Sequence, residues 1–279
     1  RAEWRMRGDA PSQHDFDHVY TRQLYAGFGH KQFGELTYGN MVTITDEVTQ
    51  SDLANTYSLT DGLLETSSRR VTQYVYNGDY GSNKVKFGAY YGGSSKRNIK
   101  NVDLKNNRKN TWGTGLIFDH EIDSIQNVTV AAGFTREISE NANKTAYYSN
   151  AYALGLAYNF VHTTYGLDLA HKDTKNKDGA GNKVKNNEVT AVIRQGLNED
   201  WNVYAMYSYK TEKTLPVGSA YSKSTDRQFL VGTEYYVYNQ GSLKVKPFLE
   251  WQATRTKYEN STVDRSRDFK TVIGLRAYW

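Results

Sequence analysis

The stretch WNVYAMYSYK, residues 201–210, alternates between two kinds of side chain. One set is apolar or aromatic and consists of Trp201, Val203, Ala205, Tyr207 and Tyr209. The intervening set is more polar and consists of Asn202, Tyr204, Met206, Ser208 and Lys210. Successive side chains of a strand point to opposite faces of a sheet, so this period of two predicts a β-strand with one apolar and one wetted face.

The same alternation recurs along the whole chain, for example in KVKFGAYYGG (84–93), QNVTVAAGFT (126–135) and TTYGLDLAHK (163–172). Helical periodicity is almost absent. We expect fourteen strands, which begin near residues 2, 22, 35, 69, 84, 111, 126, 148, 163, 187, 201, 227, 243 and 269. The pattern therefore indicates an all-β protein.

The connections between these strands alternate between long and short. Long polar segments are expected at residues 8–20, 42–67, 94–109, 137–146, 173–186, 212–225 and 258–267. Tight turns such as EIDSI, GLNED and NQGS lie between them. Long loops at one end and short turns at the other are typical of a transmembrane antiparallel up-and-down β-barrel, whereas the connections of a soluble sandwich have no such order. No linker divides the chain, so residues 1–279 are expected to form a single domain.

Composition agrees with a membrane barrel. The mean hydropathy is only −0.74, yet the chain has 23 Tyr, 5 Trp and 23 Gly against 3 Pro. A barrel that alternates apolar-out with polar-in keeps a low mean hydropathy. The second face carries Gly, Ala, Thr, Asn and charged residues, which suits a water-filled lumen and leaves the apolar face to lipid.

Several function classes are disfavoured. The chain has no Cys, which excludes disulfides and thiolate metal sites. A net charge of +5 is mild for a nucleic-acid partner. The motif HDFDH (14–18) could suggest a metal, but it lies in an expected loop without a third ligand cluster, and none of the six His has a nucleophile context. We therefore expect no metal, no cofactor and no enzymatic activity.

One expected loop has an unusual charge pattern. Between Met41 and Ser68 there are five acids and no Lys or Arg, and Arg69 and Arg70 follow at once. The acids are Asp46, Glu47, Asp52, Asp61 and Glu65. The expected inner face is mainly basic, with Lys84, Lys86, Lys172, Arg194, Lys210, Lys244, Lys246, Lys270 and Arg276 against Asp119, Asp168, Glu234 and Glu250. An acidic loop inside a basic wall would form a charged constriction, but a solvated external loop explains the spacing equally well.

Three stretches resemble the trimeric general porins of Gram-negative outer membranes: RQLYAGFGHKQFGELTYGN (22–40), TDGLLE (60–65) and TVIGLRAYW (271–279). The resemblance implies that residues 42–67 fold inward as a constriction loop. It implies that Asp61 and Glu65 form the acidic side of this constriction, with Asp52 and Asp46 as weaker candidates. The basic wall would include Arg69 or Arg70, together with Arg194, Lys84, Lys86 and Arg276.

The resemblance also implies sixteen strands, in which case two N-terminal strands would precede the fourteen visible here; a smaller barrel is the alternative. Asn40 stands where the family often has Arg, which would weaken the basic side. Trp279 would lie at the membrane interface, where an amphipathic indole is favoured.

The implied protein is a homotrimer in the outer membrane, in contact with lipid and lipopolysaccharide, and passively permeable to small hydrophilic solutes and ions. A substrate-selective or monomeric channel and a soluble carbohydrate-binding β-protein are the alternatives.

Overall fold

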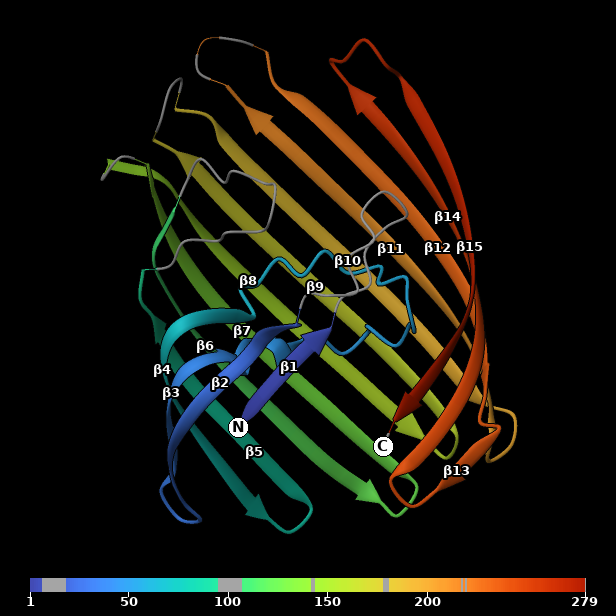
Figure 1. The fold of residues 1–279 in the computed structure, drawn as a ribbon. Helices are drawn as coiled ribbons and strands as arrows, with labels where there is room; N and C mark the ends of the chain where they lie inside the picture. Colours follow the sequence, from blue (N-terminus) through green and yellow to red (C-terminus); the bar gives the residue numbers. More distant parts are fainter. Residues whose placement is uncertain are drawn as a thin grey trace.

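The computed structural model describes residues 1–6, 19–94, 107–141, 144–177, 181–216, 218 and 220–278. These residues form one antiparallel sheet (Figure 1). Its strands are β1 (Ala2–Met6), β2 (Val19–His30), β3 (Gly34–Val42), β4 (Ser67–Tyr80), β5 (Asn83–Gly92), β6 (Asn107–Asp123), β7 (Gln126–Asn141), β8 (Lys144–Phe160), β9 (Thr163–Asn176), β10 (Lys183–Gly196), β11 (Trp201–Leu215), β12 (Ser222–Tyr235), β13 (Tyr238–Gln240), β14 (Leu243–Glu259) and β15 (Arg265–Tyr278).

Each strand pairs with its neighbour in sequence, apart from one interruption. β12 and the three-residue β13 both pair with β14, and residues 236–237 separate them. Counting β12 and β13 as one interrupted strand gives the fourteen strands expected from the sequence. The all-β, up-and-down antiparallel prediction is confirmed.

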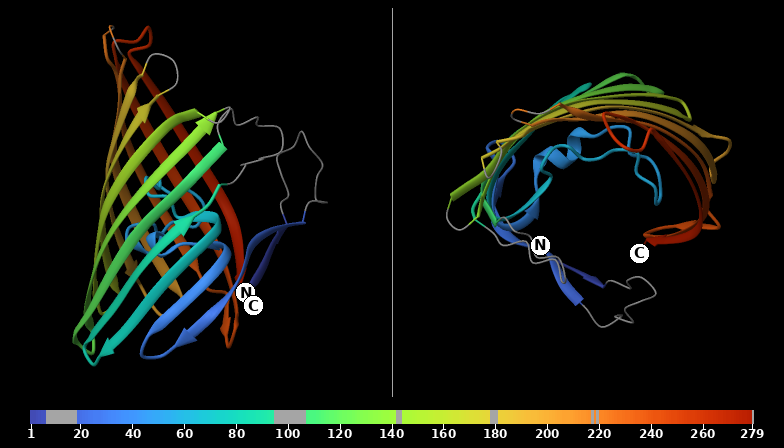
Figure 2. Two further views of the ribbon diagram at one scale, coloured as in Figure 1. Left: turned by 90° about the vertical axis from the view of Figure 1, so that its left-hand side faces the viewer. Right: turned by 90° about the horizontal axis from the view of Figure 1, so that it is seen from above.

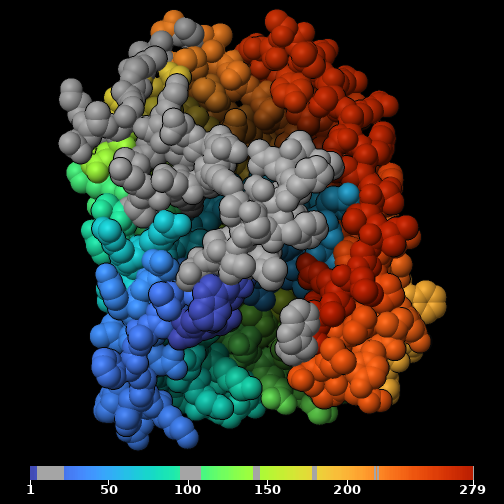
Figure 3. Space-filling view, in the orientation of Figure 1, coloured from blue at the N-terminus to red at the C-terminus, as the bar shows by residue number. Residues whose placement is uncertain are grey.

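The sheet curls into most of a barrel (Figure 2). Within the described residues β1 and β15 pair only with β2 and β14, so these two strands form the edges of the opening. The space-filling view shows the N-terminal strands in blue and the C-terminal strands in orange and red on opposite sides of it (Figure 3). The expectation of sixteen strands stays a prediction.

Large apolar side chains lie on the convex face. Phe87, Leu116, Ile193 and Ile273 are 43%, 44%, 42% and 81% exposed, which is the arrangement of a face turned toward lipid. Among the described residues, no helix is long and apolar enough to cross a membrane.

Several expected long loops are shorter in the structure. In the expected loops 173–186 and 212–225, β9 extends to Asn176, β10 begins at Lys183, β11 extends to Leu215 and β12 begins at Ser222. β6 begins at Asn107, inside the segment 94–109 that was expected to be a loop. β7 continues to Asn141 and β8 begins at Lys144, so the expected loop 137–146 is mostly strand. Polar and charged residues continue these strands beyond the apolar band, which is why their sequence is typical of loops.

The connection between β3 and β4 lies on the concave side of the sheet (Figure 2). We call residues 43–66 the inserted segment; it begins with a 3-10 helix, η1 (Ile44–Val48). Glycines on the wall permit its close approach: a Cβ on Gly155 would lie 2.1 Å from the Val48 carbonyl oxygen, and one on Gly133 would lie 2.8 Å from a Val48 methyl.

The hydrophobic core lies between the inserted segment and the wall. In one cluster Ile44, Val48 and Leu64 pack with wall residues that include Tyr90 and Ile117. In the second, Leu59 packs with Val192, Tyr204, Met206 and Leu230. Burial of these apolar side chains holds the segment inside the barrel rather than in the solvent above it.

Candidate functional site

Wall carboxylates bind the backbone of the inserted segment at several points. Asp168 on β9 accepts the N–H groups of Gln50 at 2.8 Å and Ser51 at 2.7 Å, and the Ser51 hydroxyl at 2.5 Å. Glu188 on β10 accepts the N–H of Asp61, with 3.0 and 3.1 Å to its two oxygens. A loop without its own ladder thus finds partners for its N–H groups on the wall.

Glu250 on β14 provides the largest of these anchors. Its side chain is fully buried and accepts the N–H groups of Asn55, Thr56 and Tyr57 at 2.5, 3.0 and 3.1 Å. The Tyr204 hydroxyl also donates to it, at 2.7 Å. A carboxylate surrounded by donors is an efficient acceptor, because hydrogen bonds to a charged group are stronger than neutral ones.

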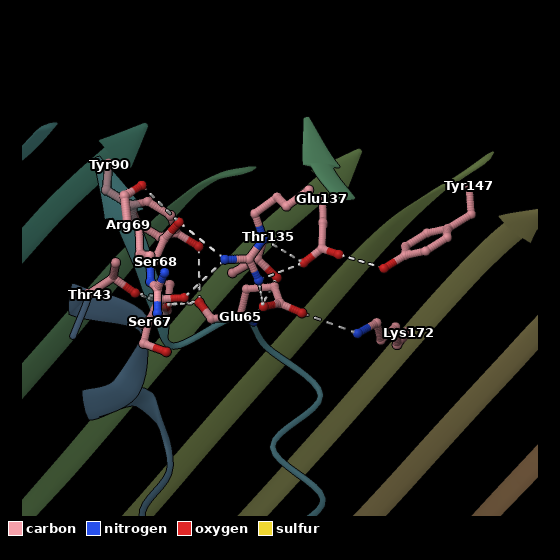
Figure 4. A network of polar contacts seen from close by, with 12 residues as sticks. Thr43, Glu65, Ser67, Ser68, Arg69, Tyr90, Thr135, Glu137, Tyr147 and Lys172 are labelled. Atoms are coloured by element: carbon pink, nitrogen blue, oxygen red, sulfur yellow. Dashed lines mark hydrogen bonds and ion pairs between the residues drawn. The ribbon is translucent and has the colours of Figure 1, made fainter. Parts of the chain in front are cut away.

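A charged cluster surrounds Glu65 at the end of the inserted segment (Figure 4). Arg108 on β6 lies 2.5 Å from the Glu65 carboxylate and 2.8 Å from that of Glu137 on β7. Lys172 on β9 lies 3.6 Å from the other Glu65 oxygen, and Tyr147 donates to Glu137 at 2.7 Å. Burial, reinforced by repulsion from Glu137, raises the pKa of Glu65 above its usual range.

Backbone contacts fix Glu65 in the same place. Its carbonyl accepts the hydroxyls of Thr45 at 2.7 Å and Tyr90 at 2.9 Å, and its N–H donates to the Thr135 hydroxyl at 3.2 Å. The carboxylate is therefore positioned from both sides of the segment.

The other acids of the segment divide into paired and unpaired groups. Asp61 pairs with Lys210 on β11, and Glu47 pairs with Lys86 on β5 at 2.5 Å. Asp46 and Asp52 are exposed and form no ion pair within the described residues. Asp61 and Glu65 therefore neutralise wall cations, and Asp46 and Asp52 are the unpaired negative charges of the segment.

The expected basic residues occupy different surroundings. Arg69 and Arg70 are exposed at the start of β4, and Arg70 has a positive φ of 53°. The arginine that reaches Glu65 is Arg108, which the sequence reading missed because residues 94–109 were expected to be a loop. The sequence offered one signal for Arg108: this arginine stands in a polar stretch directly before a strongly alternating one.

The remaining basic candidates lie nearer the short turns. Arg194 pairs with Glu234, which also accepts Lys246 at 2.6 Å. Arg276 donates to the carbonyl of Asn55 in the inserted segment. Lys84 is exposed on β5. The wall also carries the acids Glu137 and Glu188, so it is less basic than expected.

Trp279 and the HDFDH motif lie outside the described residues. Within the part of the chain that the structure describes, no group of three or more His, Asp or Glu side chains is arranged to hold a metal ion.

Comparisons with known proteins agree with this architecture. A family model for Gram-negative porins matches residues 1–246. Two major outer membrane proteins of Pasteurella multocida are similar in sequence: one is 22% identical over 98% of this chain and 75% of its own length, the other 24% identical over 94% and 68%.

Solved structures show the same fold. The outer membrane protein OmpT of Vibrio cholerae aligns over 94% of this chain and 81% of its own, with a TM-score of 0.64 and 17% identity. An anion-selective porin from Comamonas acidovorans aligns over 95% and 80%, with a TM-score of 0.66 and 14% identity. The chain therefore belongs to the Gram-negative porin family and is an outer-membrane channel for the passive diffusion of solutes.

Proposed function

We propose that residues 42–67 form the constriction of this channel and that charge pairing within it sets the ion selectivity. The observation that carries the proposal is the position of the inserted segment on the concave side of the barrel, held there by wall carboxylates. A segment across the lumen narrows the aqueous path, and charges at a narrow point act more strongly on permeating ions than charges in a wide one.

The pairing divides the candidate acids into two roles. Asp61 and Glu65 offset Lys210, Arg108 and Lys172, so their removal both subtracts negative charge and exposes cations. Asp52 has no ion pair among the described residues, so its removal subtracts negative charge alone.

The test is the reversal potential of single channels under a salt gradient in planar bilayers. Asp61→Asn with Glu65→Gln should shift the permeability ratio toward anions by more than Asp46→Asn with Asp52→Asn, which removes the same formal charge. Equal shifts would show that the pairing has no influence, and no shift in either variant would show that the segment is not the constriction. Wild-type protein without stepwise conductance would refute the channel itself.

We further propose a homotrimer, without catalytic activity, surrounded by lipid and lipopolysaccharide. A structure of the Vibrio cholerae OmpT protein with the same fold is described as a trimer form, which supports this assembly. Mild-detergent electrophoresis should give a high-mass band that converts to the monomer on heating. A monomer before heating would favour a single-chain channel.

A further inference from the structure

Three arginines occupy one row across the outward face of neighbouring strands. Arg227 on β12 lies directly opposite Arg255 on β14, which lies directly opposite Arg267 on β15. All three side chains are exposed. An even number of residues separates each arginine from an outward-facing aromatic of its own strand: Phe229 for Arg227, Trp251 for Arg255 and Phe269 for Arg267. The arginines therefore project from the convex face and not into the lumen.

No acid offsets this row within the described residues. None of the three arginines forms an ion pair there, although neighbouring cations do: Lys223 lies 3.3 Å from Glu259 and Lys185 lies 3.9 Å from Asp173. Nearer the loop between β14 and β15, Lys257 and Arg265 also lie directly opposite each other. Both are exposed, and neither forms an ion pair within the described residues. Like charges directly opposite on a sheet are destabilising, so a bound anion would relieve repulsion here.

An apolar groove of about 540 Å³ lies on the same outward face, four to six residues along the strands from this row. Its lining includes Ile193, Val203, Ala205, Val231, Leu249 and Trp251. Ala205 is paired with Ile193 on one side and Val231 on the other, and its small side chain leaves the space between them. The row of arginines and the groove together form one surface, which is charged toward the long loops and apolar toward the middle of the strands.

The row lies toward the long-loop end of the strands, at the top of Figure 1. In outer-membrane barrels the long loops face the outside and the apolar band is bounded by the two interfaces. The arginines therefore lie at the level of the headgroups of the outer leaflet, and the groove lies at the level of the acyl chains.

We propose that Arg227, Arg255 and Arg267 bind the phosphate groups of an outer-leaflet lipid whose acyl chain lies in the groove beneath them. Guanidinium groups bind phosphate oxygens in a bidentate way. Strands are about 4.8 Å apart, so the row spans about 10 Å and fits a headgroup with more than one phosphate. Continuity with the groove favours a lipid over a soluble anion. The inference rests on the proposed membrane setting but not on where the channel narrows.

The test compares lipid binding to the full-length wild type and two triple variants in detergent, counted by native mass spectrometry. The probe is a diphosphorylated lipid A, with zwitterionic phosphatidylcholine as the reference lipid. The first variant is Arg227→Gln, Arg255→Gln, Arg267→Gln. The control variant removes three cations from the loop-side ends of β9 and β10: Lys175→Gln, Lys183→Gln, Lys185→Gln.

Each arginine near a charged membrane surface is worth about fivefold in affinity, so the first variant should bind the diphosphorylated lipid on the order of 100-fold more weakly. The control variant should lose far less affinity for the diphosphorylated lipid. Phosphatidylcholine should bind all three proteins alike. Equal losses in the two variants would show that only net charge matters and would overturn the site. Unchanged binding in the arginine variant would overturn it as well.

Two further measurements separate the remaining outcomes. Complete displacement of the lipid by an equal concentration of inorganic phosphate would assign a soluble-anion site and overturn the lipid assignment. Bilayer conductance of the arginine variant should equal that of the wild type, because the row faces away from the lumen. Absence of channels in the wild type would refute the proposed function and leave the lipid result standing.

Discussion

Replacing Glu250 by Gln tests whether wall carboxylates hold the inserted segment in place. One oxygen of Glu250 accepts Asn55 N–H and the Tyr204 hydroxyl, and the other accepts Thr56 and Tyr57 N–H. Gln has the same shape but a single acceptor oxygen. If that oxygen keeps the Asn55 and Tyr204 bonds, the amide NH₂ faces the other two N–H groups, which lose their acceptor.

The size of the effect follows from the bonds lost. A hydrogen bond to a charged group contributes about 1.5–3 kcal/mol, so the loss of two lowers the free energy of local opening by at least about 3 kcal/mol. Each 1.4 kcal/mol is a factor of ten, so exchange of the Thr56 and Tyr57 amide hydrogens should accelerate by about 100-fold or more. Hydrogen–deuterium exchange with fragmentation of the peptide that contains residues 53–58 measures this directly.

A matched control uses the neighbouring anchor. Glu188→Gln alters the acceptor of the Asp61 N–H and should accelerate exchange at Asp61 but not at Thr56 or Tyr57. The other amide orientation would expose the Asn55 N–H instead, so unchanged exchange at all three of Asn55, Thr56 and Tyr57 in Glu250→Gln would refute the anchoring role. Equal acceleration there in both variants would indicate general loosening of the barrel.

The remaining predictions concern the charged cluster and the contact of the segment with the wall. Arg108→Met leaves the Glu65 and Glu137 carboxylates together without their arginine, and should destabilise the protein by about 3–5 kcal/mol, measured as a lower unfolding temperature in detergent; an unchanged temperature would contradict the ion-pair geometry. Because the pKa of Glu65 is raised, lowering the pH should protonate it before an ordinary glutamate and shift selectivity toward anions; the shift should be absent from Glu65→Gln, and its persistence there would assign it to another group. Gly155→Val puts side-chain atoms where the Val48 carbonyl lies and should displace the segment, which single-channel conductance detects; unaltered conductance would show that the segment does not limit the current.

The strands and their faces could be predicted because they depend on local alternation. In β11, Met206 and Ser208 face the lumen and Tyr207 faces outward, as the period of two requires. The same pattern could not show where a strand ends. Polar residues such as those around Arg108 occur both in loops and in strand ends above the apolar band, so the start of β6 was placed too late.

The partners of the charged residues could not be predicted from local sequence. Glu65 meets Arg108, 43 residues away, and Glu250 meets Asn55, 195 residues away, because the closing sheet brings strands from both ends of the chain around the inserted segment. The arginine row depends in the same way on the register of β12, β14 and β15. Sequence alone determined an alternating all-β membrane barrel with an acidic loop, since side-chain alternation is a property of each strand. Only the tertiary structure decided which acids are paired and which cations remain unpaired, because pairing depends on distances between segments that are remote in the chain.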